Sequence, residues 1–435
     1  MPVYLKKAAK AATTNQDGVR ATVAEIIDSI RERGETAVRE YAAKFDNWKR
    51  DFILPADEIQ QLIATVPQQV KDDIAFAYEQ VHGFALRQRE SLLEFETELY
   101  PGVVLGQRLV PCKCSGCYVP GGRFAHAASA IMSVATSRAA GVPFVVACSP
   151  PRRDSINPAV AYALTLAKAD VILALGGVQA IATMAFGLFT GKPADIIAGP
   201  GNALVAEAKR LLYGEIGIDV FAGPTESMII ADKTANPMIV AVDLVSQAEH
   251  GVDSPVWLVT DSKQLAEKVL EIMPNVIKDL PRPEVALSSW NEYGEVILCR
   301  DRVEMAEVSD EYAAEHVQII ADDLDWYLRK LENYGSLFLG EASTVVYGDK
   351  VSGTNHILPT KKAGRYSGGL NVGKFIKTLT YQKLTQEANR KIGAVASRIS
   401  RVEGMEGHAR SADIRLRKYF PNEQFDFEVY RQKDY

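Results

Sequence analysis

The sequence predicts an α/β protein with doubly wound parallel sheets, with helices at its N-terminus and a helical extension at its C-terminus. Two observations predict this fold class. Strand-like apolar runs alternate with helical segments of roughly ten to fifteen residues from about residue 103 onward. The chain has 435 residues, which is too long for one hydrophobic core, so more than one domain is expected.

The N-terminal part is expected to be helical, because segments 18–46 and 57–92 place apolar residues at helical spacing. A first series of strands, each followed by a helix, then ends in "CYVPGG", "VVACSPP", "DVILALGG" and "DIIAGPG". A second series suggests a separate sheet, with strands in "SMIIAD", "SPVWLVTD", "GEVILCRD", "HVQIIADD" and "SLFLG". From about residue 371 the chain is polar, helical and poor in apolar residues, so it should pack on the main body or on a partner subunit.

Composition and charge exclude several classes of function. The apolar fraction of 47% and the charged fraction of 24% are ordinary for a soluble globular protein. A formal charge of -6 argues against a nucleic-acid partner. No apolar run is long enough for a membrane span, and the N-terminus "MPVYLKKAAK" lacks the apolar core of a signal peptide. We therefore expect a cytoplasmic protein with no membrane partner.

A cysteine cluster in "VPCKCSGCYVP" resembles a metal site at first sight, because Cys112, Cys114 and Cys117 lie close together. A structural zinc site normally uses four ligands, in two pairs separated by a loop. Here the segment alternates as a strand does, which would place neighbouring cysteines on opposite faces. The cluster is therefore interpreted as small residues that pack in a strand.

Three glycine-rich turns, "YVPGGR", "LALGGVQAI" and "IAGPGNALVAEAK", each follow an expected strand and open a helix. Free N–H groups at a helix start favour the negative groups of a ligand. None of the turns matches GxGxxG with an acidic residue about twenty positions later, so the usual dinucleotide fingerprint is absent. They are either ordinary tight turns or a ligand site at the carboxyl edge of one sheet.

Four of the six histidines lie beside other metal-ligand or acid–base residues. Gln247 and His250 are three positions apart in "SQAEHG", so both side chains leave one helix face. Glu315 and His316 are adjacent at the entrance of a strand, where they could divide proton transfer and water activation. The other groups are Asp349 with His356 in "YGDKVSGTNHILPT" and Glu403 with His408 in "EGMEGHARS". Gln247, His250, Asp349 and His408 form a nitrogen-and-oxygen set that suits zinc, but spacing alone does not bring them together.

The combined motifs resemble the histidinol dehydrogenase family. "YVPGG", "GGVQAIA", "GPGNALVAEAKR", "AGPTES", "SQAEHG", "AEH", "GDKVSGTNHILPT" and "EGMEGHARS" occur in the order of that family, over about residues 100 to 415. The resemblance implies two Rossmann-like domains with a C-terminal extension, assembled as an interlocked homodimer. The expected layout is an N-terminal arm (1–20), a first α/β domain on the substrate and zinc side (21–117 with 225–370), a second on the NAD side (118–224), and an extension contributing to the dimer (371–435).

The resemblance also implies roles for individual residues. Gln247, His250, Asp349 and His408 fall on the zinc ligands, the last supplied by the partner subunit, with one Zn²⁺ in each subunit. Glu315 and His316 fall on the catalytic pair. Tyr118, Gln179 and Asn202 fall on the NAD⁺ contacts. Thr225, His356 and Glu403 fall on positions that contact the substrate, although many members have serine where this chain has Thr225.

The implied chemistry is the oxidation of a small primary alcohol through an aldehyde to a carboxylate, with two NAD⁺ consumed in succession. Basic residues near two of the motifs, Arg123 and His126 in "GGRFAHAAS" and Lys361, Lys362, Arg365 and Lys374 in "LPTKKAGRYSGGLNVGK", are similar to the sulfopropanediol branch of the family. A fixed cation suits a sulfonate, so Arg123 and Lys361 are candidate substrate contacts. The expected substrate is 2,3-dihydroxypropane-1-sulfonate, which would be converted to sulfolactate.

Three alternatives stay open at this point. The substrate could be L-histidinol, converted to L-histidine, in which case the lysines would be a solvated surface. The chain could be a catalytically silent zinc-binding homologue, although an intact Glu315–His316 pair argues against this. It could also be a metal-free two-electron dehydrogenase, which a chelator would leave active.

Overall fold

The computed structural model describes residues 1–10, 16–121, 125–220 and 223–425. It is a mixed α/β protein, as predicted, and it divides into two compact units. The first unit comprises Met1–Glu90 and Pro111–Phe375, and the second comprises Ser91–Val110 and Ile376–Tyr435. Both parallel sheets belong to the first unit, so the predicted division into two α/β domains stays a prediction.

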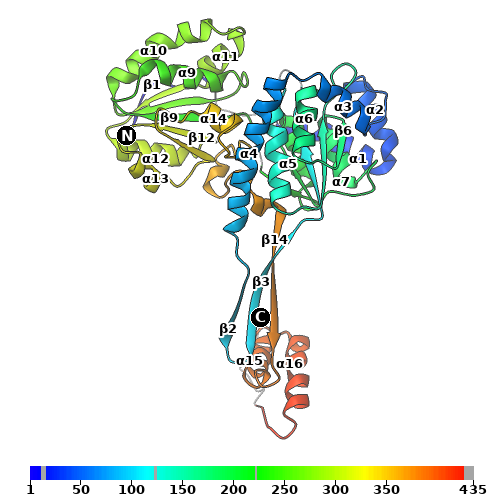
Figure 1. Cartoon of the computed structure of the whole chain (residues 1–435). Coiled ribbons are helices and arrows are strands. Elements are labelled where there is room, and N and C mark those ends of the chain that lie inside the picture. Colours follow the sequence, from blue (N-terminus) through cyan, green and yellow to red (C-terminus); the bar gives the residue numbers. More distant parts are fainter. Residues whose placement is uncertain (11–15, 122–124, 221–222, 426–435) are drawn as a thin grey trace. The chain divides into compact units, whose positions relative to one another are not determined.

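A five-stranded, fully parallel sheet forms one half of the first unit (Figure 1). Its strands are β4 (Cys114–Tyr118), β5 (Phe144–Ser149), β6 (Val171–Ala174), β7 (Ile196–Ala198) and β8 (Gly217–Ile218), in the order β6-β5-β4-β7-β8. Its helices are α5 (Ala127–Ala139), α6 (Pro158–Leu166), α7 (Gly177–Phe186) and α8 (Ala203–Leu212). The N-terminal helices pack on these: α1 (Gln16–Arg33) and α2 (Glu35–Phe45) contact α7, while α3 (Ala56–Ala64) and α4 (Gln68–Glu90) contact α6. Within this sheet the chain runs from the central strand β4 through β5 to β6 at one edge. It then returns to β7 and β8 on the other side of β4, which is the doubly wound pattern.

A six-stranded sheet forms the other half of the first unit, in the order β1-β11-β10-β9-β12-β13. Its strands are β1 (Val3–Lys6), β9 (Ser227–Ala231), β10 (Val256–Thr260), β11 (Glu295–Leu298), β12 (His316–Ile320) and β13 (Ser336–Leu339). All pairs are parallel except β1 with β11. Figure 1 shows α9 (Pro237–Ala248), α10 (Lys263–Lys278) and α11 (Pro283–Tyr293) on one face, and α12 (Arg302–Tyr312) and α13 (Leu324–Lys330) on the other. Its five parallel strands repeat the winding order of the other sheet.

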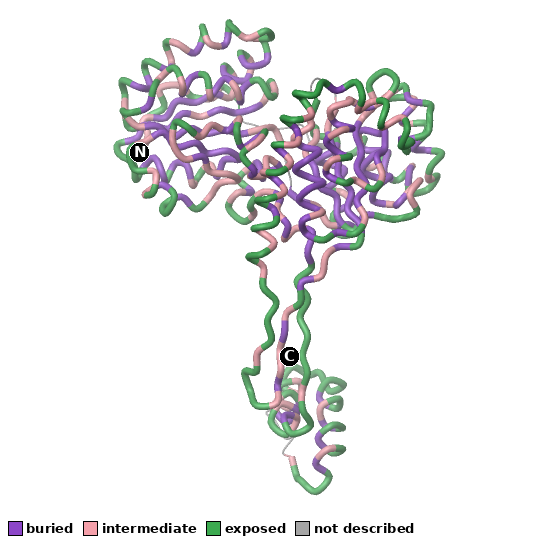
Figure 2. The backbone as a smooth tube through the Cα atoms, in the orientation of Figure 1, coloured by how far each residue is buried: buried purple, intermediate pink, exposed green. Residues whose placement is uncertain are grey.

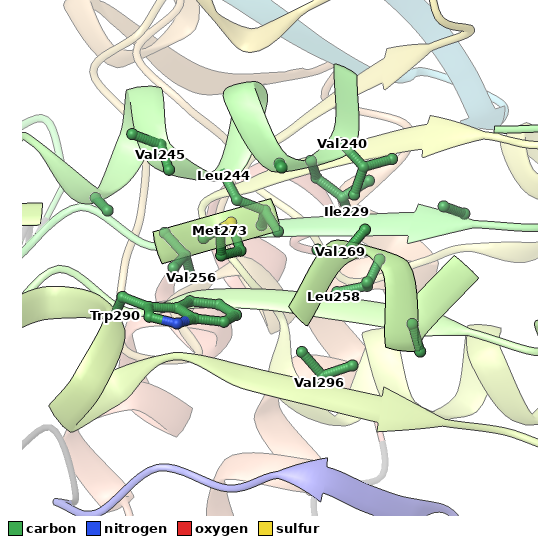
Figure 3. Packing of buried hydrophobic residues seen from close by; sticks show 14 of the residues in the cluster. Ile229, Val240, Leu244, Val245, Val256, Leu258, Val269, Met273, Trp290 and Val296 are labelled. Atoms are coloured by element: carbon green, nitrogen blue, oxygen red, sulfur yellow. The ribbon is translucent and has the colours of Figure 1, made fainter. Parts of the chain in front are cut away.

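Helix α9 is fixed firmly on this sheet. It begins at Asn236, whose side chain accepts a hydrogen bond from the N–H of Met238, and Pro237 opens its first turn. Val240 and Leu244, one helical turn apart, are fully buried in the same cluster as Ile229 of β9 (Figure 3). Burying each such side chain contributes about 1.5–3 kcal/mol. Figure 2 shows that buried residues concentrate along the strands of both parallel sheets.

The second unit has a three-stranded sheet, β14-β3-β2, and two helices. The elements are β2 (Phe95–Tyr100), β3 (Val103–Pro111), β14 (Ile376–Leu384), α15 (Asn389–Val402) and α16 (Glu406–Tyr419). The expectation of a wholly helical C-terminal segment was therefore wrong at β14. That strand is mostly exposed, so its pairing with β3 rather than an apolar face defines it. A small core around Leu416 and Phe420 joins α15 and α16. In the described part of the chain, no helix has the length and apolarity needed to cross a membrane.

Candidate active site

The predicted catalytic pair lies at the amino end of β12. Glu315 immediately precedes the strand and His316 is its first residue. Because β12 pairs in parallel with β9, with His316 opposite Ser227, the pair lies beside Glu226, which precedes β9. The N–H of Glu226 donates to Oε2 of Glu315 over 3.0 Å, and the carbonyl oxygen of Glu226 accepts from the N–H of His316 over 3.1 Å. One residue thus holds both members of the pair through its backbone.

The same carbonyl orients the imidazole of His316. Nδ1 lies 3.2 Å from the oxygen of Glu226, and a carbonyl only accepts, so Nδ1 carries the proton in this contact. The other nitrogen, Nε2, is buried without a hydrogen-bond partner among the described residues. It lies 3.4 Å from Oδ1 of Asp349 in α14 (Val345–Lys350). Nε2 therefore faces the part of the site where Asp349 lies.

Burial and charge shift the pKa values of this group. Burial raises the pKa of Glu315 to about 8 and that of Glu226 to about 7. Burial alone would lower the pKa of His316, but the carboxylates of Glu315 and Asp349 outweigh it and raise the pKa. Burial would raise the pKa of Asp349, but His316 outweighs it and lowers the pKa to about 2. Three carboxyl groups and one imidazole therefore compete for protons, a pattern that is typical of acid–base sites.

The structure brings three of the four predicted zinc ligands into the same unit. Gln247 is buried near the end of α9, and its Oε1 has no hydrogen-bond partner among the described residues. His250 lies just beyond that helix rather than on it, with its N–H bonded to the carbonyl of Gln247. Desolvation lowers the pKa of His250 and the charge of Asp349 raises it, so these two side chains are electrostatic neighbours. A buried amide oxygen without a hydrogen-bond partner among the described residues, an imidazole and a carboxylate are donor types that fit a divalent cation.

The fourth predicted ligand, His408, belongs to α16 of the second unit and is exposed, as is the predicted substrate contact Glu403. Both assignments stay predictions. Within the described ranges, no group of three or more His, Cys, Asp and Glu side chains could hold a metal ion. The first unit contributes His250 and Asp349 of these residue types to the predicted set, and the third, His408, lies in the second unit.

The predicted substrate contacts differ in how the structure places them. Thr225 is half-buried next to Glu226. Nδ1 of His356 lies 3.0 Å from the carbonyl oxygen of Asp349, and its Nε2 lies 2.9 Å from Oγ of Ser129 in α5. Burial lowers the pKa of His356 to about 4, so its ring is neutral near pH 7. This histidine links the loop after α14 to the helices of the five-stranded sheet.

Lys361 follows the same loop. Its N–H donates to Oε1 of Glu226 over 2.9 Å, and the charge of its side chain lowers the pKa of that carboxyl. Gly223 also donates to the side chain of Thr360, which fastens this turn beside the catalytic pair. The other predicted basic contact, Arg123, lies outside the described residues.

The predicted NAD⁺ contacts lie at the carboxyl edge of the five-stranded sheet. Tyr118 ends β4, and its hydroxyl accepts from the N–H of Gly177 at the start of α7. Gln179, in the first turn of α7, is buried and donates to Asp46. Asn202 caps α8 by accepting from the N–H of Val205. The three turns therefore follow β4, β6 and β7 at the carboxyl edge of one sheet, but the cofactor itself stays a prediction.

Sequence reasoning missed a buried ion pair that supports one of these turns. Lys209 of α8 contacts Asp219, and both side chains are almost fully buried. Lys209 also donates to the carbonyl of Gly199, while the N–H of Gly199 donates to Asp219 over 2.7 Å. The pair therefore fixes the glycine turn before Asn202. The buried position of a lysine in "VAEAKR" shows only in the structure.

The cysteine cluster lies in and beside a buried strand, and its interpretation as packing residues stays a prediction. Cys114 and Cys117 lie in β4, all three cysteines of the cluster are buried, and the backbone N–H of Cys112 donates to the carbonyl oxygen of Phe375. Burial raises the pKa of Cys114 to about 11 and that of Cys117 to about 12. Neutral thiols of this kind are poor metal ligands.

Comparison with known proteins agrees with this arrangement. The family model described as histidinol dehydrogenase matches residues 9–416. Sulfopropanediol 3-dehydrogenase of Ruegeria pomeroyi is 53% identical over 97% of this chain and 98% of its own length. A histidinol dehydrogenase homolog of Pelagibacter ubique is 53% identical over 96% of this chain and 98% of its own length. Histidinol dehydrogenase of Methanothermobacter thermautotrophicus is 39% identical over 93% and 95%.

A solved structure confirms the fold. The crystal structure of histidinol dehydrogenase from Elizabethkingia anophelis superposes with a TM-score of 0.88 at 32% identity, covering 95% of this chain and 94% of that one. The match extends over nearly the whole chain, and the residues that the family model matches include Glu315, His316 and Asp349. The chain therefore belongs to the histidinol dehydrogenase family and is an oxidoreductase.

Proposed function

We propose that the protein is a zinc- and NAD⁺-dependent dehydrogenase that oxidises 2,3-dihydroxypropane-1-sulfonate through its aldehyde to sulfolactate. The single observation that carries the chemistry is the buried Glu315–His316 pair, which the backbone of Glu226 holds with Nε2 of His316 directed to Asp349. The name of the Ruegeria relative supports the substrate.

The proposed roles follow from the positions of the side chains. Zinc, when bound, would polarise and orient the alcohol, and NAD⁺ would accept hydride. Gln247, His250, Asp349 and His408 would hold the ion. His316 takes the hydroxyl proton of the alcohol at Nε2 while hydride leaves the carbon that bears this hydroxyl, which gives the aldehyde and the first NADH.

The second oxidation needs water. Glu315, once ionised, is a stronger base than an exposed carboxylate because burial raises its pKa. It removes a proton from water as the oxygen attacks the aldehyde carbon, while His316 returns its proton to the carbonyl oxygen, which gives the hydrate and leaves His316 neutral. His316 then takes the hydroxyl proton of the hydrate as the second hydride leaves. The products are the carboxylate and two NADH for each alcohol.

Basic residues favour a sulfonate over the cationic histidinol. Lys361 lies in a turn fastened to Glu226, and the charges of Lys361 and Lys362 reach that carboxyl. An ammonium group beside the catalytic pair attracts an anionic substrate and repels a cationic one. The second candidate is oxidation of L-histidinol to L-histidine, which the family match favours.

The test is NADH formation by the zinc-loaded protein with dihydroxypropanesulfonate and L-histidinol side by side. We expect two NADH for each sulfonate molecule and slow turnover of histidinol. Lys361→Met should raise the KM for the sulfonate about tenfold, and Lys233→Met, which removes an exposed lysine elsewhere, should leave it unchanged. Faster turnover of L-histidinol would contradict the proposed sulfonate substrate. Zinc binding without turnover of either compound would favour a catalytically silent homologue.

We also propose that the protein works as a homodimer in which the partner supplies His408 and Glu403. The exposure of both residues in the second unit supports this. Asp349→Ala and His408→Ala chains should each be inactive, but unfolding and refolding an equal mixture should restore about a quarter of the parent activity, because half of the dimers are mixed and have one intact site. No recovery from a refolded mixture that contains mixed dimers would contradict shared sites.

A further inference from the structure

We propose that Asp243 is a positioning residue that joins the three elements of the candidate active site, α9, β12 and α14. This inference rests on the proposed zinc site, since it assigns to Asp243 the task of setting the spacing of the ligands. Nothing in the roles described above uses Asp243, which lies in α9 and is half-buried.

Asp243 makes one hydrogen bond to each of the other two elements. Its Oδ2 accepts from Nε2 of Gln318 in β12 over 2.8 Å. Its Oδ1 accepts from Oγ1 of Thr344, the residue that precedes α14, over 3.1 Å. One carboxylate therefore joins a helix, a strand and a second helix that are far apart in the sequence, and we call these three residues the Asp243 bridge.

Each residue of the Asp243 bridge lies close in sequence to a predicted ligand or base on the same element. Asp243 precedes Gln247 by four positions, so both lie on the same face of α9, about 6 Å apart along its axis. Gln318 follows His316 by two positions, so both side chains leave the same face of β12. Thr344 precedes α14, the short helix that carries Asp349. A shift of any one element at the bridge is therefore passed on to the adjacent ligand or base.

The bonding of Thr344 and Gln318 is unusual for their positions. Thr344 has the extended backbone of an N-cap, but its hydroxyl makes no capping bond to α14 and points to Asp243 instead. Gln318 is fully buried, and although its Oε1 has no partner among the described residues, its Nε2 donates to Asp243. Thr344 and Gln318 therefore both direct a side-chain hydrogen bond to Asp243, and Thr344 does so in place of a capping bond.

The test uses the dimeric, full-length protein and measures zinc affinity by competition with a chromogenic chelator. Thr344→Val, which keeps the shape but removes the hydroxyl, should weaken zinc binding about tenfold or more, whereas Thr344→Ser should restore it. Asp243→Ala should weaken it at least as much. Ser262→Ala, which removes a cap from α10 far from the bridge, lowers stability without changing zinc affinity.

Hydrogen exchange of the same variants provides a second measurement that does not depend on bound zinc. Hydrogen exchange of the Val351 amide, which bonds to Tyr347 at the end of α14, should accelerate in Thr344→Val but not in Thr344→Ser. Unchanged zinc affinity and unchanged exchange in folded Thr344→Val and Asp243→Ala proteins would overturn the bridge while leaving the zinc site intact. A parent protein that binds no zinc would overturn the zinc site itself, and in that case exchange alone decides whether Asp243 holds α14.

Discussion

The two parallel sheets wind in the same order but carry the predicted site residues at opposite edges. In the five-stranded sheet, glycine turns and helix starts gather at the carboxyl ends of β4, β6 and β7. In the six-stranded sheet, Glu226 and the Glu315–His316 pair lie at the amino ends of β9 and β12. Strand order alone therefore does not decide which edge of a doubly wound sheet becomes the site.

The charge at the carboxyl edge of the six-stranded sheet disfavours an anionic cofactor there. Aspartates follow four of its strands: Asp232 after β9, Asp261 after β10, Asp301 after β11, and Asp322 and Asp323 after β12. The nearby charges of Asp232 and Asp301 help burial to raise the pKa of Asp261. An anionic pyrophosphate is repelled from such an edge, whereas the glycine turns of the other sheet offer free N–H groups.

The largest expected effect on turnover comes from substitutions at the amino edge of the six-stranded sheet. Glu315→Gln and His316→Gln remove the two acid–base groups and should lower turnover by about 10²–10⁴-fold. Binding of NADH should stay unchanged, because its predicted contacts lie on the other sheet. Steady-state rates and fluorescence titration on the same samples check both halves. Loss of NADH binding in either folded variant would break the comparison.

The carboxyl edge should respond to a change at Gly199. A Cβ there would lie 2.0 Å from the carbonyl oxygen of Tyr118, at a φ of +128°. Gly199→Ala should therefore lower the free energy of unfolding by about 1–3 kcal/mol and weaken NAD⁺ binding. Gly191→Ala is the matched control, since its φ is also positive but its Cβ meets no atom within 4 Å. Denaturant melts and cofactor titrations should separate the two; equal effects would mean that backbone strain alone matters.

The smallest effect is expected at the cysteines. Cys114→Ser changes one buried atom in β4, so zinc content should stay the same as in the parent protein. Elemental analysis after dialysis measures this. Zinc lost from a folded Cys114→Ser protein would move the metal site away from the amino edge of the six-stranded sheet.

The sequence predicted the alternation of strands and helices well, because each of these elements carries its own apolar pattern. It did not predict β14, whose exposed residues become a strand only through pairing with β3. It also missed the bridging roles of Glu226 and Asp243. Glu226 bonds to Glu315, 89 positions away, and Asp243 bonds to Gln318, 75 positions away. Such contacts leave no local pattern, whereas adjacent residues such as Glu315 and His316 do.

The most direct test of the division between the two edges is NADH binding, followed by fluorescence, in Glu315→Gln and Asn202→Ala proteins. We expect the first to bind NADH as the parent does and the second to bind it at least several-fold more weakly. Asn202→Ala also loses a helix cap worth about 1 kcal/mol, so Asn157→Ala, which removes the cap of α6, is the control. Weak binding in Glu315→Gln with full binding in Asn202→Ala would contradict the account.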